Sequence, residues 1–253
     1  TNIDRQAFFS ASSYFPESYA KWLQRESVTV VPLDINASDA ELERMMERID
    51  GLLLTGGASP IFAGNGSVSV DASSSSVRKV KVPSYYARKV SALVRKAKSI
   101  NDGGRRFPIW ATCLGFESLL LIESDFSVLL SRVANENVAG AVKVVSGGSA
   151  YARFMRAHGL PASALNARRY AFSHFYGFTL VSFMANARLR AKYRLVATSV
   201  TKSGTKIVAA VESLEYPFFA TQFHPEKIEG EHLASLQIPR DAESVKIART
   251  LAK

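Results

Sequence analysis

The sequence predicts an α/β fold in which helices flank an open, mostly parallel sheet. Two apolar segments, residues 28–32 and 51–54, have the composition of buried strands. Between them, Ser38 and Glu41 form the capping-box pattern that begins a helix. A third apolar segment, residues 107–112, follows an amphipathic helix that is rich in Lys and Arg. Strands that alternate with helices in this way are typical of parallel sheets.

Periodicity and helix-breaking residues predict further elements along the chain. A Ser-rich stretch, residues 58–77, is expected to form a loop. The aromatic stretch 170–178 is expected to be a strand or a loop at the edge of a pocket. We expect helices at residues 17–25, 38–49, 84–100, 116–122, 151–158 and 241–252, and further strands at residues 7–9, 142–145, 193–199, 206–211 and 218–223.

The composition is that of a protein with one large core. The 253 residues are 47% hydrophobic, and no Pro-, Gly- or Ser-rich linker divides them cleanly, so we expect one domain over residues 1–253. The one cysteine excludes an internal disulfide. No apolar run approaches the roughly 18 residues that a transmembrane helix needs.

The net charge of +10 is unevenly distributed along the sequence. Residues 78–106 contain ten Lys and Arg and one acid, and residues 137–211 contain eleven Lys and Arg and no acid. This asymmetry indicates a polyanionic partner, for which a polyacidic substrate, a nucleic acid and an anionic membrane are all candidates. An ordinary solvated surface explains the same charges about equally well.

Cys113 stands at a sharp change of periodicity. A short apolar strand precedes it, and an apolar helix follows Gly115. A nucleophile on such a strand-to-helix turn is lifted out of the sheet and lies beside the amide N–H groups of the helix N-terminus. Those amides favour a thiolate and stabilise an oxyanion. Because a lone cysteine is usually a small buried hydrophobic residue, this stretch alone leaves the two interpretations about equal.

His224 and Glu226 also follow the end of a predicted strand. In a parallel sheet they meet Cys113 at the carboxyl edge, where open α/β sheets place their sites. Cysteine attack requires a base and a group that orients this base, so the three residues fit a catalytic triad. The backbone N–H groups of Gly57 and Leu114 are candidates for an oxyanion hole. For His-Pro-Glu taken alone, a capped turn is the alternative.

Three motifs together resemble the γ-glutamyl hydrolases of the class I glutamine-amidotransferase-like superfamily. They are Thr-Gly-Gly at residues 55–57, Pro-Ile-Trp-Ala-Thr-Cys-Leu-Gly-Phe-Glu at residues 108–117 and Gln-Phe-His-Pro-Glu-Lys at residues 222–227. The resemblance implies a flavodoxin-like, three-layer α/β/α fold with a mostly parallel central sheet. It also implies a cysteine peptidase that cleaves γ-glutamyl bonds of folate polyglutamates. By residue match, the family's nucleophile, histidine and acid fall on the triad named above.

The resemblance also implies a substrate site around the triad. It suggests substrate-binding roles for Tyr19, Gly56, Glu117, His174 and Tyr176. Structural roles remain open for these side chains, such as simple packing for Tyr19 and a buried, hydrogen-bonded state for His174. The resemblance implies no cofactor and no metal.

Glu117 separates two branches of the superfamily. Glutamine amidotransferases resemble one another in a Gln at the fourth position after the nucleophile, whereas this sequence has an acid there. The sequence therefore resembles the hydrolase branch. Its first 16 residues match the family's opening strand poorly, so we expect the first strand of the sheet to be altered or missing.

Two functional hypotheses follow from these residues. The first is hydrolysis of γ-glutamyl bonds in folate or pteroyl polyglutamates through an acyl-enzyme, with a homodimer as one expected assembly. The second is a hydrolase-derived structural or binding subunit of a larger complex with an anionic surface, either mitochondrial or RNA-associated and with little activity. The resemblance implies a lysosomal, vacuolar or secreted location, and the basic composition suits a mitochondrial one equally well.

Overall fold

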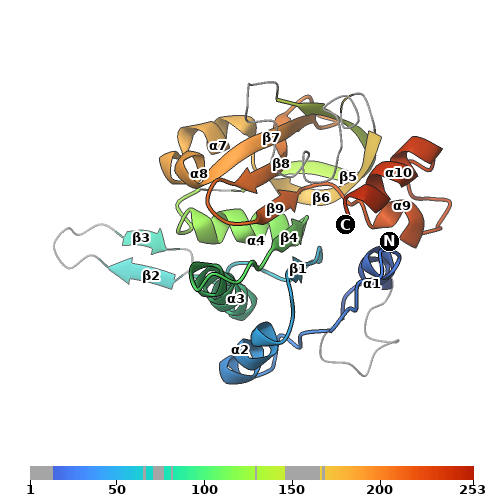
Figure 1. Ribbon diagram of the computed structural model, residues 1–253. Helices are drawn as coiled ribbons and strands as arrows, with labels where there is room; N and C mark the ends of the chain where they lie inside the picture. The colour runs from blue at the N-terminus through green and yellow to red at the C-terminus, as the bar shows by residue number, and fades with distance from the viewer. Residues whose placement is uncertain are drawn as a thin grey trace, which may run out of the picture.

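The computed structural model describes residues 14–64, 67–70, 77–80, 82–128, 130–145, 166 and 169–253. In this part of the chain, a seven-stranded sheet lies between helices on its two faces (Figure 1). The described helices are α1 (Glu17–Gln24), α2 (Asp39–Glu47), α3 (Tyr85–Asp102), α4 (Leu114–Glu123), α7 (Leu180–Ala185), α8 (Ala187–Lys192), α9 (Lys227–Gly230) and α10 (Ala242–Thr250). The described strands are β1 (Leu52–Leu54), β2 (Ser67–Val70), β3 (Val77–Val80), β4 (Ile109–Thr112), β5 (Ser131–Val144), β6 (Arg169–Gly177), β7 (Tyr193–Val200), β8 (Lys206–Ser213) and β9 (Phe218–Thr221).

The large sheet has the strand order β1-β4-β9-β8-β7-β5-β6. Its first three strands pair in parallel, and the remaining neighbours pair antiparallel. The predicted α/β fold is confirmed, but the sheet is mixed: the parallel pairing predicted for most of it is limited to β1, β4 and β9. Because the carboxyl ends of these three strands lie at one edge, the residues that follow them are brought together there. The expectation of one domain over residues 1–253 stays a prediction.

The strand predicted at residues 28–32 is wrong, because this segment connects α1 to α2 without regular structure. Val28 and Val31 are 40% and 47% exposed, so the segment lacks the burial that its composition suggested. In the described part of the chain, β1 pairs with β4 on one side and has no ladder with residues 28–32 on the other. A β-branched run forms a strand only where a neighbouring strand pairs with it.

The loop predicted at residues 58–77 is wrong in part. The strands β2 and β3 pair antiparallel within and just after it, and Figure 1 shows this pair extending away from the body of the molecule. The alternating Ser-Val-Ser-Val of residues 67–70 is a period-two pattern that the Ser-rich composition obscured. The strand predicted at residues 7–9 and the helix predicted at residues 151–158 lie outside the described residues.

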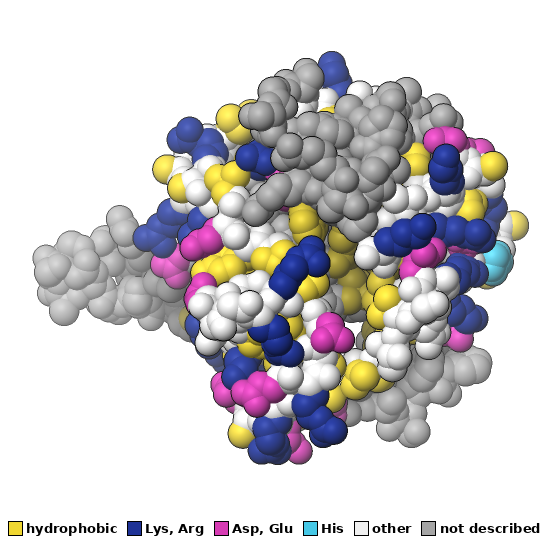
Figure 2. Space-filling view, in the orientation of Figure 1, with side chains coloured by type: hydrophobic (Ala, Val, Ile, Leu, Met, Phe, Trp, Pro, Cys, Tyr) yellow, Lys and Arg dark blue, Asp and Glu magenta, His cyan; other side chains and the backbone are white. Residues whose placement is uncertain are grey.

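The basic side chains of α3 are partly used in ion pairs. Lys89 contacts Asp39 of α2 at 2.6 Å, and Lys98 contacts the buried Glu123 of α4 at 2.6 Å. On the face shown in Figure 2, Lys and Arg are interspersed with acids, and hydrophobic side chains lie in a central hollow. The polyanionic partner inferred from the charge distribution stays a prediction. None of the described helices is both long and apolar enough to cross a bilayer.

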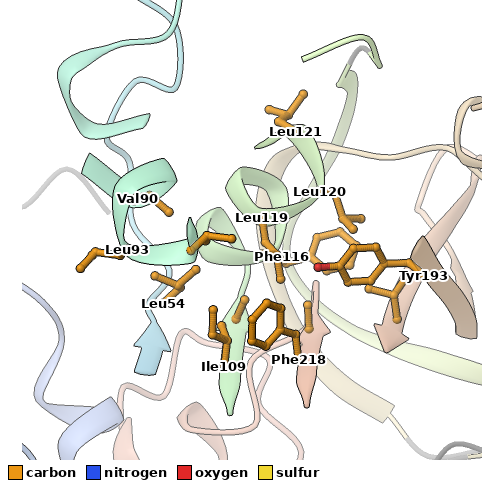
Figure 3. Close-up of a cluster of buried hydrophobic side chains, with 14 of the residues drawn as sticks. Leu54, Val90, Leu93, Ile109, Phe116, Leu119, Leu120, Leu121, Tyr193 and Phe218 are labelled. Atoms are coloured by element: carbon orange, nitrogen blue, oxygen red, sulfur yellow. The ribbon is translucent and has the colours of Figure 1, made fainter. Parts of the chain in front are cut away.

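Alternation along the strands divides the core between the two faces of the sheet. Leu54, Ile109 and Phe218 face the cluster formed with α3 and α4, and Figure 3 shows Leu119 of α4 directed toward them. The intervening residues, including Leu53 and Trp110, face the cluster that contains α1 and α10. The strands therefore bury side chains on both faces, as parallel strands covered by helices do.

The first turn of α4 lies directly against β1. A Cβ at residue 115 would overlap the carbonyl oxygen of Leu54, so glycine alone fits this position. The contact joins the end of β1 to the start of α4, and Cys113 and Gly57 lie on its two sides. Close helix-to-strand packing at this point therefore sets the geometry of the turn at Cys113.

Replacing Gly115 by Ala should destabilise the fold by about 3 kcal/mol, because the added methyl group meets rigid backbone. Urea unfolding followed by circular dichroism measures the change. The matched control is Gly103→Ala at the end of α3, where a Cβ would lie 3.4 Å from the carbonyl oxygens of Ile100 and Ser99. Equal stability of the two variants would contradict the close contact at residue 115.

Candidate active site

Cys113 and His224 lie at the same edge of the sheet because they follow neighbouring parallel strands. Cys113 comes directly after β4, and its N–H donates to the carbonyl of Thr221 at the end of β9 at 2.9 Å. His224 follows β9, and its N–H donates to the carbonyl of Ala171 on β6 at 2.9 Å. These backbone bonds place the two side chains at the carboxyl ends of the parallel strands.

The backbone of Cys113 has φ 54° and ψ −109° at the N-terminus of α4. A non-glycine residue with positive φ is uncommon, and such strain is found at turns that present a nucleophile. The thiol is 5% exposed, and its Sγ lies 3.7 Å from the carbonyl oxygen of Ser173 on β6. The predicted strand-to-helix turn is therefore present, and it holds the sulfur in a nearly closed site.

His224 and Glu226 form a buried pair. Nδ1 of the imidazole donates to Oε1 of the carboxylate at 2.6 Å, and the two residues are 5% and 1% exposed. Burial lowers the pKa of His224, but the Glu226 carboxylate and Cys113 outweigh burial and raise this pKa to about 10. Nε2, the other ring nitrogen, has no hydrogen-bond partner among the described residues. The imidazole is therefore oriented by Glu226 and has one nitrogen left for proton transfer.

Tyr19 connects α1 to this pair. Its hydroxyl oxygen accepts a hydrogen bond from the N–H of Gly56 at 2.7 Å and lies 3.4 Å from Nδ1 of His224. Burial, together with the charges of Glu226 and Cys113, raises the pKa of Tyr19 well above its usual value. The hydroxyl is thus neutral and enclosed, and it holds the Gly56 turn against the His224 pair.

The Gly56–Gly57 turn passes close to the nucleophile. A Cβ on Gly56 would lie 3.2 Å from Cβ of Cys113 and 2.5 Å from the Tyr19 hydroxyl, so a side chain has no room there. A Cβ on Gly57 would lie 3.4 Å from a methyl group of Leu114. The Gly56 N–H is already bonded to Tyr19, so the predicted oxyanion hole of Gly57 and Leu114 does not include it and stays a prediction.

Glu117 lies on the first turn of α4 and is 6% exposed. Its Oε1 accepts a hydrogen bond from Nε2 of Gln222 at 3.1 Å. Burial raises the pKa of Glu117 to about 8, although the Gln222 hydrogen bond and the charge of His224 act in the opposite direction. Glu117 therefore retains its proton at neutral pH. Gln222 belongs to the motif at residues 222–227, but sequence reasoning gave it no role because its partner lies on another element.

His174 and Tyr176 both come from β6. His174 is 4% exposed, and its Nδ1 lies 2.6 Å from the carbonyl oxygen of Tyr176. Burial lowers the pKa of His174 to about 4, and the charge of His224 contributes to the lowering. The Tyr176 side chain is 52% exposed and lines the same open groove as Cys113 and His224.

The structure thus gathers the predicted site residues around one groove. Its walls include the triad, the glycine turn and β6, and the groove continues along β1 toward residues 28–35. Tyr19 and Glu117 are enclosed by protein, so they reach the groove chiefly through the groups they contact. The catalytic and binding roles assigned to these residues stay predictions.

Two family models match the chain. Residues 3–122 match the family described as Peptidase C26, and residues 86–237 match the family described as Glutamine amidotransferase class-I. The second match covers more than half of the chain. The chain belongs to the class-I glutamine amidotransferase family.

Several relatives of this glutamine amidotransferase family member are named as γ-glutamyl hydrolases. The chain is 27% identical to "Probable gamma-glutamyl hydrolase 3" of Arabidopsis thaliana over 99% of its own length and 65% of the relative's. It is 28% identical to "Gamma-glutamyl hydrolase" of Rattus norvegicus, with 95% and 69% covered, and 28% identical to the Mus musculus protein of that name, with 85% and 61% covered. The chain therefore spans about two thirds of the length of these curated relatives. The resemblance predicted from the three motifs is confirmed.

Because Glu117 is buried, the free energy of unfolding of this protein should depend on pH. The folded pKa of Glu117, about 8, lies above the value of 4.5 that is expected for the unfolded chain. Between these values the unfolded state releases a proton that the folded state keeps, so the free energy of unfolding falls as pH rises from 4.5 to 8. The isosteric Glu117→Gln variant should lack this contribution, and urea unfolding at pH 5, 6, 7 and 8 measures the slope. Parallel pH curves for the two proteins would contradict a protonated Glu117.

Proposed function

We propose that this protein hydrolyses γ-glutamyl bonds with Cys113 as its nucleophile. The observation that carries the proposal is the triad geometry: a thiol on a strained strand-to-helix turn beside an imidazole that a buried carboxylate orients at 2.6 Å. Family membership and the names of the relatives support the same chemistry. Folate polyglutamates are the substrate we propose, because the motifs resemble those of enzymes that act on them.

In the first step, the Cys113 thiolate attacks the γ-carbonyl carbon of the substrate. The carbonyl oxygen gains negative charge, which the N–H groups of Gly57 and Leu114 stabilise at the N-terminus of α4. The protonated Nε2 of His224 then gives its proton to the leaving nitrogen, and the C–N bond breaks. The product is a thioester between Cys113 and the γ-glutamyl group, with the amine released.

Water resolves the thioester in the second step. Neutral His224 takes a proton from the water, whose oxygen attacks the thioester carbon, and the C–S bond breaks to release the γ-carboxyl group. Glu226 stabilises the imidazolium that forms and keeps Nε2 directed at the sulfur. The buried carboxylate therefore acts through the imidazole in both steps.

The Lys and Arg residues of the chain support a polyacidic substrate. A polyglutamate tail carries one negative charge per residue, so the positive net charge increases its local concentration at low salt. Tail length and the position of cleavage are left to experiment. A lysosomal, vacuolar or secreted location stays a prediction that accompanies this proposal.

Replacing Cys113 by Ser should abolish glutamate release from a γ-linked diglutamyl substrate, because the hydroxyl is a far weaker nucleophile than a thiolate. Release of glutamate is measured with a coupled dehydrogenase assay on the purified protein. The unfolding midpoint in urea serves as the control that the variant is folded. Full activity in the folded variant would sink the mechanism.

Reaction with iodoacetamide distinguishes the hydrolase hypothesis from the hypothesis of a structural subunit with little activity. Cys113 is the one cysteine of the chain, so mass spectrometry reads its alkylation without ambiguity. If Cys113 is an activated thiolate, it should be alkylated within minutes at neutral pH, and glutamate release should fall in parallel. An inert buried thiol does not react. An inert thiol together with no glutamate release would favour the structural hypothesis.

Replacing Tyr19 by Phe keeps the packing of the ring but removes the hydroxyl that accepts from the Gly56 N–H and holds this turn against the His224 pair. We therefore expect kcat to fall about tenfold with little change in KM. The same glutamate-release assay measures both constants. The matched control is Tyr193→Phe, since Tyr193 is equally buried and its hydroxyl has no hydrogen-bond partner among the described residues. A loss of equal size in both variants would point to a general packing effect instead.

A further inference from the structure

Asn135 is the residue of β5 that stands opposite His174 of β6. Directly opposed residues of an antiparallel pair project from the same face, with Cβ atoms about 5 Å apart. The pairing is irregular on both sides of this position, between Arg132 and Asn135 and between Asn135 and Val138. Such bulges redirect side chains and are frequent beside active sites. The backbone of β5 is thus distorted around the residue that faces His174.

The side chain of Asn135 is enclosed and unsatisfied. The residue is 0% exposed, and neither its Nδ2 nor its Oδ1 has a hydrogen-bond partner among the described residues. A buried polar group without a partner costs about 1–3 kcal/mol, so such groups are rare unless they have a function. The sequence offered no signal for this residue, because its partner is set by strand register.

His174 has a buried acceptor that lacks a hydrogen-bond donor. Its Nδ1 lies 2.6 Å from the Tyr176 carbonyl oxygen, which only accepts, so Nδ1 carries the proton and Nε2 is an acceptor. Nε2 is buried and has no partner in the described structure. Gln222 lies near the ring, since a Cβ on Gly177 would be 3.4 Å from its Oε1 and 3.6 Å from Cε1 of His174, but its Nε2 donates to Glu117 and its Oε1 only accepts. A donor to Nε2 therefore has to come from elsewhere, and Asn135 is the residue that stands opposite His174 on β5.

We propose that Asn135 is a positioning residue whose side-chain Nδ2–H donates to Nε2 of His174 and fixes the ring in its Nδ1–H tautomer beside Cys113. The bond requires the Asn135 side chain to turn toward the ring, and its terminal amide rotates about χ2, which is a soft torsion. His174 is then held at both ring nitrogens, by Tyr176 on one side and by Asn135 on the other. The Ser173 carbonyl, next to His174 on β6, contacts the sulfur, so the pair also fixes the β6 wall of the site.

In the proposed hydrolase, the consequence is that His174 stays neutral while His224 is charged. His224 is the charged group that acts on His174, and a second imidazolium beside it would compete for the thiolate. A donor on Nε2 opposes protonation there, because that nitrogen has no free lone pair for a proton. This role in catalysis rests on the proposed function, whereas the hydrogen bond itself does not.

Nitrogen NMR of the full chain labelled with 15N-histidine tests the hydrogen bond without any substrate. At pH 7 the wild type should show His174 with a protonated Nδ1 and an unprotonated, hydrogen-bonded Nε2, assigned by loss of the signals in His174→Gln. Asn135→Asp places a carboxylate against Nε2, so both nitrogens should become protonated and the pKa of His174 should rise. Asn135→Ala should leave the Nδ1–H tautomer in place, because Tyr176 still accepts from Nδ1, and should shift the Nε2 signal to the value of a nitrogen with no donor.

The matched control is Asn137→Asp, the same change two residues further along β5. Asn137 is partly exposed, and its side chain is already satisfied, since it donates to the carbonyl of Ser235 and accepts from the N–H of Gln237. This variant should leave the His174 signals at their wild-type positions. Wild-type His174 signals in both Asn135 variants, or equal shifts in the control, would overturn the proposal. Asn135→Asp is nearly isosteric, so it keeps the test valid if Asn135→Ala does not fold.

Kinetics on the γ-linked diglutamyl substrate then measure the effect on the reaction. Asn135→Ala should lower kcat/KM by about 3- to 10-fold, the value of one neutral hydrogen bond. Asn135→Asp should lower it further and add an ionisation near neutral pH to the rate profile, and His174→Gln in the same chain should remove that ionisation. If the wild type shows the expected NMR signals and no hydrolysis, the proposed function fails while the hydrogen bond stands.

Discussion

The site depends on the close backbone contact between β1 and the first turn of α4. Because residue 115 has no side chain, the helix begins directly beside the Leu54 carbonyl. This contact brings the Gly56–Gly57 turn alongside Cys113, where a Cβ on Gly56 would lie 3.2 Å from Cβ of Cys113. The Tyr19 hydroxyl then holds the turn from the other side by accepting a hydrogen bond from the Gly56 N–H.

The titratable groups around the sulfur have widely different pKa values because their surroundings differ. Glu226 keeps the pKa of His224 high, whereas burial keeps the pKa of His174 low and that of Glu117 high. One imidazole is thus charged, the other is neutral, and the second carboxyl is protonated, all at one edge of the sheet. Environments that separate similar groups in this way are how one site assigns different proton-transfer roles.

Local sequence patterns predicted what is local in the structure. Cys113, His224 and Glu226 follow strand ends, so strand order alone brought them together. The strand predicted at residues 28–32 is wrong because the composition of a segment does not show whether a neighbouring strand is present to pair with it. Gln222 and Asn135 could not be found, because their importance depends on which residue stands opposite them across the sheet, and register is not written in either strand by itself.

The hydrogen bond between Trp22 and Ala248 fastens α1 to α10 at 2.7 Å across 226 positions of sequence, and Tyr19 of α1 meets His224 across 205. The turn at Cys113 joins β4 to α4, but its N–H is bonded to the Thr221 carbonyl of β9, which lies in the last part of the sequence. The base and the helix that braces Tyr19 are also synthesised late, and long-range contacts of this kind form last. A nascent chain therefore contains Cys113 before His224 can lie beside it, and the proposed site is assembled only with the final closure of the fold.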